Sequence, residues 1–239
     1  MRIDVHYTAA QIDDELAALW HRLRDPATPL QRLRHTAHLP GFAVRYRCTD
    51  GSVFVYVEDL AQRRLAGYTV FRRLDGIDRR SRGAVLSPHS KFAPAYQRRG
   101  LASHVYGWML DGGVCLVSGA RQSPAAHALW RSIGRARHLG YARCGDRHLR
   151  YLGADAPPGA FDDLDTRMVL WGAGWCEERF ERLAPPRGRP ALQLRGPSMS
   201  STRIQASNCS ALTRPDAIAA SRRLESPRCA ALAISAARS

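Results

Sequence analysis

The chain has 239 residues and a hydrophobic content of 45%, which is enough to build one sizeable globular core. Its formal net charge of +15 comes almost wholly from arginine, because Lys91 is the only lysine, and this charge predicts attraction to polyanions. The first residues carry charge where a secretory signal needs an apolar stretch, and no later run has the length of a membrane span. We therefore expect a cytoplasmic protein with no membrane partner.

Six cysteines are scattered along the chain without a Cys-x-x-Cys pair, which predicts reduced thiols and no disulfide framework. Cys144, His138 and His148 do not complete a tetrahedral set of ligands, and nothing near His35 and His38 supplies one. We therefore expect no metal site.

The first helix is predicted to begin at Thr8, because the spacing from Thr8 to Gln11 is that of a capping box. Residues 2–7 alternate as a strand would, Asp25-Pro26 ends the helix, and residues 27–41 are expected to be a loop or weakly helical. Three strands rich in Val, Tyr and Phe then predict an antiparallel meander over residues 42–48, 53–58 and 65–71.

The second half of the chain predicts an extended segment from Ala84, a glycine-containing turn and an amphipathic helix. A short apolar strand follows, and Ser123 with Pro124 then has the pattern of an N-cap and first residue of the next helix. Strands are expected at 114–118, 148–152 and 167–171. We expect an α/β domain over residues 1–178 and a disordered tail rich in Arg, Ser, Ala and Pro over residues 179–239.

The segment 91–103 carries the chemistry, because it passes from an extended stretch directly into a helix. A helix that begins at a glycine-containing turn exposes backbone N–H groups and the positive end of its dipole, which suits a pyrophosphate. Gly100 and Ala102 keep the main chain accessible, while Arg98 and Arg99 add positive charge at the rim. The alternative is an ordinary turn with two solvated arginines.

This segment resembles the acetyl-CoA-binding motif of the GNAT N-acetyltransferase superfamily, Gln/Arg-x-x-Gly-x-Gly/Ala. A second motif of that superfamily, Asn-x-x-Ala-x-x-Leu-Tyr-x-x-x-Gly-Phe, is matched in part further along the chain. The resemblance implies a GNAT-like mixed central sheet with an antiparallel meander, splayed central strands and flanking helices. It also implies transfer of an acetyl group from acetyl-CoA, as co-substrate, to a primary amine by direct attack on the thioester. The matching positions are Gln97, Gly100 and Ala102 for the first motif, and Ser123, Ala126, Leu129, Trp130 and Gly134 for the second.

The same resemblance implies which residues bind the co-substrate: Phe92, Ala93, Gln97, Arg98, Arg99, Gly100, Leu101, Ala102, Ser103, Ser123 and Trp130. Trp130 stands where many members carry a tyrosine that protonates the thiolate, and an indole cannot do this, so that catalytic role is not carried over. His89 and Glu58 are candidates for the general base. A histidine with satisfied hydrogen bonds and a surface glutamate are the commoner explanations for such residues.

A second hypothesis, from another functional class, is a catalytically impaired GNAT-like module that binds nucleic acid or another acidic partner through its basic charge. A third joins the two, with RNA as the carrier of the amine. The acceptor stays open, because its recognition is expected in the variable loops 27–41 and 153–166. A monomer and a homodimer both remain open.

Overall fold

The computed structural model describes residues 1–25, 33–74, 84–145 and 148–182. The predicted tail lies outside the described residues, apart from its first four. The helices are α1 (Ala9–Arg24), α2 (Leu101–Asp111), α3 (Pro124–Gly134) and α4 (Glu177–Glu181), with a short 3-10 turn, η3 (Pro94–Tyr96). The strands are β1 (Arg2–Ile3), β2 (Arg34–Leu39), β3 (Phe42–Thr49), β4 (Ser52–Asp59), β5 (Arg64–Arg73), β6 (Val85–Phe92), β7 (Cys115–Val117), β8 (Arg121–Gln122), β9 (Leu139–Gly145), β10 (His148–Gly153) and β11 (Thr166–Leu170). Across these ranges, no helix is both long enough and apolar enough to cross a membrane.

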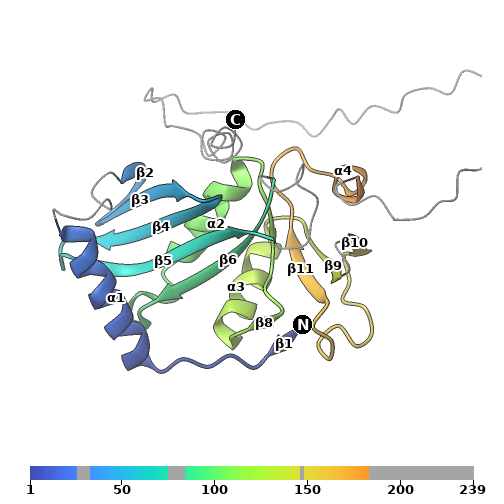
Figure 1. Ribbon diagram of the computed structural model, residues 1–239, viewed down its shortest axis with the longest axis horizontal. Helices are drawn as coiled ribbons and strands as arrows, with labels where there is room; N and C mark the ends of the chain where they lie inside the picture. The colour runs from blue at the N-terminus through green and yellow to red at the C-terminus, as the bar shows by residue number, and fades with distance from the viewer. Residues whose placement is uncertain (26–32, 75–83, 146–147, 183–239) are drawn as a thin grey trace, which may run out of the picture. The chain divides into compact units, whose positions relative to one another are not determined.

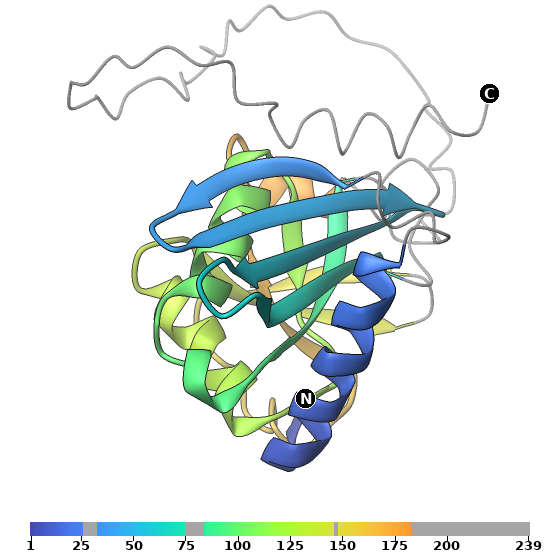
Figure 2. The same cartoon turned by 90° about the vertical axis from the view of Figure 1, so that its left-hand side faces the viewer.

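Nine strands form one mixed sheet in the order β10-β9-β11-β7-β6-β5-β4-β3-β2, and β1 forms a separate parallel pair with β8. Strands β2 to β6 are consecutive antiparallel neighbours, which confirms the predicted meander. Helix α1 covers one face of the meander and α2 covers the other, while α3 lies beside α2 and contacts β9 and β11 (Figure 1, Figure 2). The predicted fold class, a mixed α/β sheet with flanking helices, is confirmed.

Alternation along the strands decides which helix each side chain meets. On β5, Tyr68 donates a hydrogen bond to Glu15 of α1, whereas Phe71 packs edge-on against Tyr106 of α2 with ring centroids 5.8 Å apart. Successive side chains of a strand point to opposite faces, so residues 68 and 71 of this strand serve different faces. The meander therefore has one face toward α1, which carries several polar groups, and a mainly apolar face toward α2.

Local signals fix the beginnings of two helices as predicted. The Thr8 hydroxyl accepts the backbone N–H of Gln11 at 3.2 Å, and the Gln11 side chain accepts the N–H of Thr8 at 2.9 Å, which is a complete capping box. Ser123 Oγ accepts the N–H of Ala126 at 3.1 Å, with Pro124 in the first turn of α3.

Four strands differ from the sequence prediction, one of them β8, which is not among the predicted strands and pairs with β1. The segment 27–41 is not simply a loop or weak helix, because Arg34–Leu39 pairs with β3 as the edge strand β2. The closing part of the sheet has a further strand, β9, which pairs with both β10 and β11. The first strand is short, since its ladder with β8 comprises Arg2 and Ile3, followed by one further hydrogen bond of 3.1 Å from the N–H of Val5 to the carbonyl of Gln122.

Packing continues past residue 178, the position at which the sequence places the domain boundary. Phe180 of α4 is fully buried and contacts the rings of Tyr151, Trp171 and Trp175, with centroids 6.3 to 6.5 Å apart. This aromatic cluster covers β10 and β11. Helix α4 is therefore part of the folded domain.

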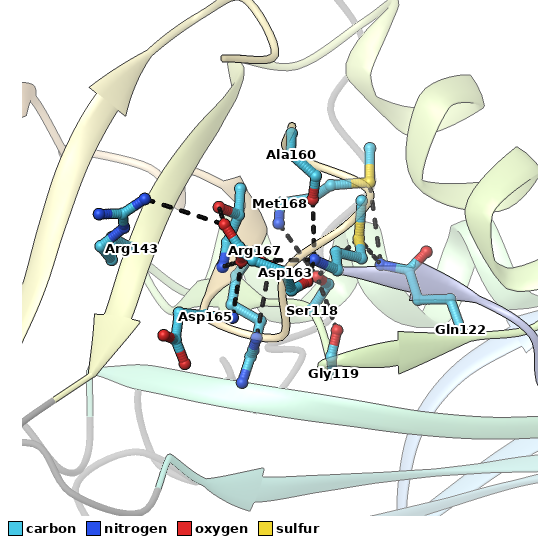
Figure 3. A network of polar contacts seen from close by, with 11 residues as sticks. Ser118, Gly119, Gln122, Arg143, Ala160, Asp163, Asp165, Arg167 and Met168 are labelled. Atoms are coloured by element: carbon cyan, nitrogen blue, oxygen red, sulfur yellow. Dashed lines mark hydrogen bonds and ion pairs between the residues drawn. The ribbon is translucent and has the colours of Figure 1, made fainter. Parts of the chain in front are cut away.

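The connection between β10 and β11 is held by a polar network around Asp163 (Figure 3). The Asp163 carboxylate accepts the N–H groups of Thr166 and Asp165 at 2.5 and 2.8 Å and the Thr166 hydroxyl at 2.9 Å. The buried amino group of Met1 lies 3.7 Å from the same carboxylate and donates to the carbonyl of Ala160 at 2.8 Å. These contacts fasten the first strand to the closing part of the sheet.

Candidate functional site

The two parallel strands at the centre of the sheet are paired only where they begin. Val85 lies opposite Cys115 and Leu86 opposite Leu116, whereas β6 continues along β5 as far as Phe92. Beyond Leu86, the β7 side of β6 has no strand partner among the described residues. The predicted splay of the central strands is therefore confirmed, and β6 borders the resulting gap.

The register of β6 identifies which of its backbone groups face the gap. The N–H of Ala93 donates to the carbonyl of Ala66 at 3.0 Å, which fixes the phase of the β5–β6 ladder. Alternate residues of an antiparallel pair direct their N–H and C=O groups to opposite sides, so Ser90 and Phe92 direct theirs toward the gap. The Gln97 side chain donates to the carbonyl of Phe92 at 3.0 Å. Within the described part of the chain, the N–H of Phe92 and both groups of Ser90 remain for a ligand, whereas Ala93 is already paired to β5.

The turn from β6 into α2 presents a run of backbone donors. Gly100 is the N-cap, with φ of 76°, and Arg98 also has a positive φ, of 60°. The N–H of His104 donates to the carbonyl of Gly100 at 2.9 Å, whereas the N–H groups of residues 98–103 have no acceptor in the part of the chain that the structure describes. Several unpaired N–H groups at the positive end of a helix form an anion site. We call residues 98–103 the cradle.

Space above the cradle is open, as a ligand requires. A Cβ placed on Gly100 would meet no protein atom within 4 Å. Leu101 is buried in the core, while Ala102 and Ser103 have short side chains and are half-buried. The first turn of α2 is therefore approachable from outside without displacement of a large side chain, which fits a phosphate group.

Two arginines line the rim of the cradle, and one of them stacks on aromatic rings. Arg98 and Arg99 are exposed, and the guanidinium of Arg99 lies 5.1 Å from the ring centroid of Phe42 and 5.5 Å from that of Tyr96. Stacking of this kind orients a guanidinium while leaving its N–H groups available. The sequence prediction placed these arginines at the rim, and their exposure is compatible with that role.

A chain of hydroxyl groups lies on the α2 side of the gap. Ser90 Oγ is 2.8 Å from Thr69 Oγ1 and donates to the hydroxyl of Tyr106 at 3.3 Å. Tyr106 is 2% exposed, and its own proton finds no acceptor among the described residues. Burial raises the pKa of Tyr106 to about 12, so the phenol stays protonated at neutral pH. Sequence reasoning missed this residue, because its position on the apolar face of a helix indicates only packing.

Trp130 lies against Tyr106 within the core. Trp130 is 2% exposed, and the two rings meet edge-on with centroids 6.0 Å apart. Ser123 is half-buried, and its hydroxyl oxygen serves as the cap of α3. Trp130 therefore packs against the Tyr106 ring, whereas the hydroxyl of Ser123 caps the beginning of α3.

The two candidate bases lie on different strands and are not brought together. His89 is on β6, and its ring centroid is 6.4 Å from that of Tyr68. Partial burial, together with the positive charges of Lys91 and Arg72, lowers the pKa of His89. Glu58 is two strands away on β4 and accepts a 2.8 Å hydrogen bond from Arg45. Of the two, His89 is the one on the strand that borders the gap.

A further polar cluster on the α1 face was not found from the sequence. The Glu15 carboxylate accepts hydrogen bonds from the Tyr68 hydroxyl and from Lys91 Nζ, each at 2.5 Å. Burial opposes ionisation of Glu15, but these two bonds lower its pKa overall. The cluster joins α1 to β5 and β6 beside His89.

A scan of family models and a search of curated proteins return no match. Among solved structures, a GNAT superfamily phosphinothricin acetyltransferase from Sinorhizobium meliloti in complex with acetyl-CoA is 17% identical, over 71% of this chain and 88% of its own, with a TM-score of 0.34. A ribosomal-protein alanine acetyltransferase from Vibrio fischeri is 12% identical, over 52% of this chain and 64% of its own, with a TM-score of 0.31. A spermidine N-acetyltransferase chimera that includes the Vibrio cholerae enzyme is 16% identical, over 72% of this chain and 83% of its own, with a TM-score of 0.29.

Because these TM-scores and identities are low, the functional proposal rests on the geometry of the cradle and of the gap between β6 and β7. The solved structures that this chain resembles are acetyltransferases, one of them named as a member of the GNAT superfamily.

Proposed function

We propose that this protein is an N-acetyltransferase that moves the acetyl group of acetyl-CoA to a primary amine. The observation that carries the proposal is a run of backbone donors at residues 98–103 that find no acceptor among the described residues, directly beside the open edge of β6. Acetyl-CoA has a pyrophosphate for the first feature and an amide-containing arm that ends in a thioester for the second. Phe92 and Ser90 offer the backbone groups that pair with such an arm.

The residues on the two faces of β6 offer a base and a hydrogen-bond donor, two groups that assist the aminolysis of a thioester. The reaction needs a neutral amine, stabilisation of the charge that develops on the acyl group, and a fixed orientation of both reactants. Bound acetyl-CoA supplies the acyl carbon. The amine nitrogen bonds to this carbon, the C–S bond breaks, and CoA leaves as the thiolate. We assign acceptance of the amine proton to His89 and a hydrogen bond to the developing charge to Tyr106.

The lowered pKa of His89 supports its assignment as the base, because a histidine that is neutral at neutral pH can accept a proton. Tyr106 is suited to a hydrogen bond rather than to complete proton transfer, since its pKa of about 12 lies above that of a thiol. Trp130 does not need to act as an acid in this scheme. Its edge-on contact holds the Tyr106 ring in place.

The proposal is tested by calorimetry of acetyl-CoA binding to the full chain. We expect the wild type to bind and the Gly100→Glu variant to lose binding, because a carboxylate would occupy the open space above the cradle. A side chain at φ of 76° costs about 1–2 kcal/mol of strain, so the matched control is Gly100→Gln, which has nearly the same size and strain as Gly100→Glu but no charge. Gly100→Gln should bind acetyl-CoA more weakly than the wild type but more tightly than Gly100→Glu.

Folded wild-type protein that does not bind acetyl-CoA would overturn the proposal. The hypothesis of a module that binds an acidic partner would then take its place. Loss of binding in Gly100→Gln to the same degree as in Gly100→Glu would show that strain or bulk, and not repulsion between a carboxylate and the pyrophosphate, causes the loss.

A further inference from the structure

A pocket of about 410 Å³ lies on the α1 face of the sheet, over the strands of the meander. Its apolar walls come from Trp20, Tyr56 and three leucines, and its polar lining comes from Arg24, Arg45, Glu58 and Arg63. This volume falls within the range of small-molecule sites, which combine apolar walls with a few charged groups. The pocket has no part in the proposed binding of acetyl-CoA.

The charges in this pocket do not cancel. Glu58 is neutralised by Arg45, whose Nε lies 2.8 Å from the carboxylate. Arg24 and Arg63 form no ion pair with any residue that the structure describes. The guanidinium of Arg24 lies 5.4 Å from the ring centroid of Trp20. Two arginines without acidic partners beside an indole suit a carboxylate or phosphate on an apolar body.

Arg63 is held at the pocket by an unusual backbone. Its φ is 50°, a conformation that residues with a Cβ rarely adopt and that persists where the surrounding structure imposes it. The turn in which it lies is fixed by Asp59, whose carboxylate accepts the N–H of Gln62 at 2.9 Å. Arg63 therefore lines the pocket because of the geometry of its turn.

The same hairpin also supports the cradle. Asp59 and Arg64 lie next in sequence to Glu58 and Arg63, and both contact the hydroxyl of Tyr96, just before the cradle, at 2.8 and 2.9 Å. One hairpin thus lines the pocket with two side chains and holds the turn before α2 with two others. The pocket and the cradle are built on one structural unit.

We infer that this pocket receives an anionic group of the acetyl acceptor, and that the acceptor carries a carboxylate or phosphate about 10 Å from its reacting amine. The inference rests on the proposed function. The distance follows from the sheet, because β6, which carries the proposed base and borders the gap, lies two strand spacings from β4, and two spacings amount to about 10 Å. Three extended residues of a peptide cover about the same length. A peptide amine with an acidic third residue therefore has the required shape.

The test uses two tripeptide amides, Ala-Ala-Glu and Ala-Ala-Gln, which differ only in one charge. With acetyl-CoA as donor and release of the CoA thiol as the readout, we expect kcat/KM to be about tenfold or more higher for the glutamate peptide, as for one charge-assisted contact. Arg24→Gln and Arg63→Gln should each reduce this preference several-fold without a change in the KM for acetyl-CoA. Arg150→Gln, an exposed arginine on β10, is the matched control and should keep the preference.

Two results would overturn the inference: equal use of the two peptides by the wild type, or an unchanged preference in an Arg24→Gln/Arg63→Gln double variant. Protein that binds acetyl-CoA but acetylates neither peptide would also overturn it, while leaving the proposed function in place. Absence of acetyl-CoA binding would instead overturn the proposed function. Both arginines are exposed, so thermal melts should show that the variants remain folded.

Discussion

The hydroxyl of Tyr96 donates a 2.8 Å hydrogen bond to the carboxylate of Asp59, and this bond ties the turn before α2 to the hairpin between β4 and β5. Both residues are buried, and Arg64 adds a 2.9 Å hydrogen bond to the same hydroxyl. The N–H of Gln62 and then the Tyr96 hydroxyl lower the pKa of Asp59, so the carboxylate stays ionised. The position of the cradle therefore depends on a contact outside it.

Replacement of Tyr96 by phenylalanine should weaken acetyl-CoA binding without touching the cradle itself. The change leaves Asp59 and Arg64 without their shared partner, and loss of a buried hydrogen bond of this kind costs about 1–3 kcal/mol of unfolding free energy. We expect a several-fold higher dissociation constant by calorimetry and a lower melting temperature. Tyr7→Phe, at an exposed ring, is the control. Unchanged affinity in Tyr96→Phe would show that the cradle holds its shape without this bond.

Asp163 should make the stability of the domain sensitive to acid. The N–H of Thr166, in first place, lowers the pKa of Asp163 from 3.8 to about 2. A depressed carboxyl pKa stabilises the fold above the unfolded-state value and loses this effect as pH falls through the folded-state value. The window is therefore about pH 4 down to about pH 2. The side chain is 38% exposed, and solvent screening reduces the effect.

We expect Asp163→Asn to melt a few degrees below the wild type at pH 7, and the difference to shrink as pH falls below 4. Thermal denaturation followed by circular dichroism over a pH series measures both. Asp155→Asn, an exposed aspartate of the same connection, is the control. A difference in melting temperature that stays constant from pH 7 to pH 3 would contradict the assignment.

Elements with local signals could be predicted from the sequence, whereas those defined by their partners could not. Thr8 with Gln11 and Ser123 with Pro124 determine helix starts by contacts within four residues. Strands β2 and β9 lack such signals, since β2 is an edge strand with many polar residues and β9 contains Gly140 among residues of mixed polarity. Their strand character comes from pairing with neighbours.

The candidate site likewise has one part that could be predicted from the sequence and one part that could not. The helix start at the cradle could be predicted, because Gly100 and the residues around it follow one another directly in the sequence. The identity of the gap-facing backbone groups depends on the β5–β6 register, so Ser90 could not be singled out. Thr69, Ser90 and Tyr106 are 21 and 16 positions apart and meet only because β5, β6 and α2 are packed together.

With His89 as the base, its protonation should produce an acidic limb in the pH profile of kcat/KM. Partial burial, followed by the charges of Lys91 and Arg72, lowers its pKa below the ordinary 6.5, so the neutral base persists to pH values below 6.5. We expect kcat/KM to fall first below about pH 8, as the amine is protonated, and a second time below pH 6.5, as His89 is protonated. His89→Gln should remove the lower limb and reduce the rate about 10²–10⁴-fold. A lower limb that survives in His89→Gln would assign the base elsewhere.

Tyr106 should affect the chemical step and not acetyl-CoA binding. Its hydroxyl accepts from Ser90 and has no acceptor of its own among the described residues, so its proton is available to a charge that develops in the gap. We expect Tyr106→Phe to lower kcat about 10²-fold or more, the loss typical of one donor to a developing charge, with the dissociation constant for acetyl-CoA unchanged. Tyr46→Phe, buried at 1% exposure against Trp108 of the same helix, is the control and should retain kcat.

A rescue variant distinguishes a hydrogen-bonding role of the Tyr106 hydroxyl from a role of the Tyr106 ring in packing alone. The Trp130 ring meets the Tyr106 ring edge-on at 6.0 Å, so a tyrosine at position 130 would bring a second hydroxyl to the neighbourhood of the first. If a missing hydrogen bond causes the loss, the Tyr106→Phe/Trp130→Tyr double variant should recover part of kcat, although removal of the indole lowers the melting temperature. If disturbed packing causes the loss, the double variant should be slower still, because it removes a second large ring from the same cluster.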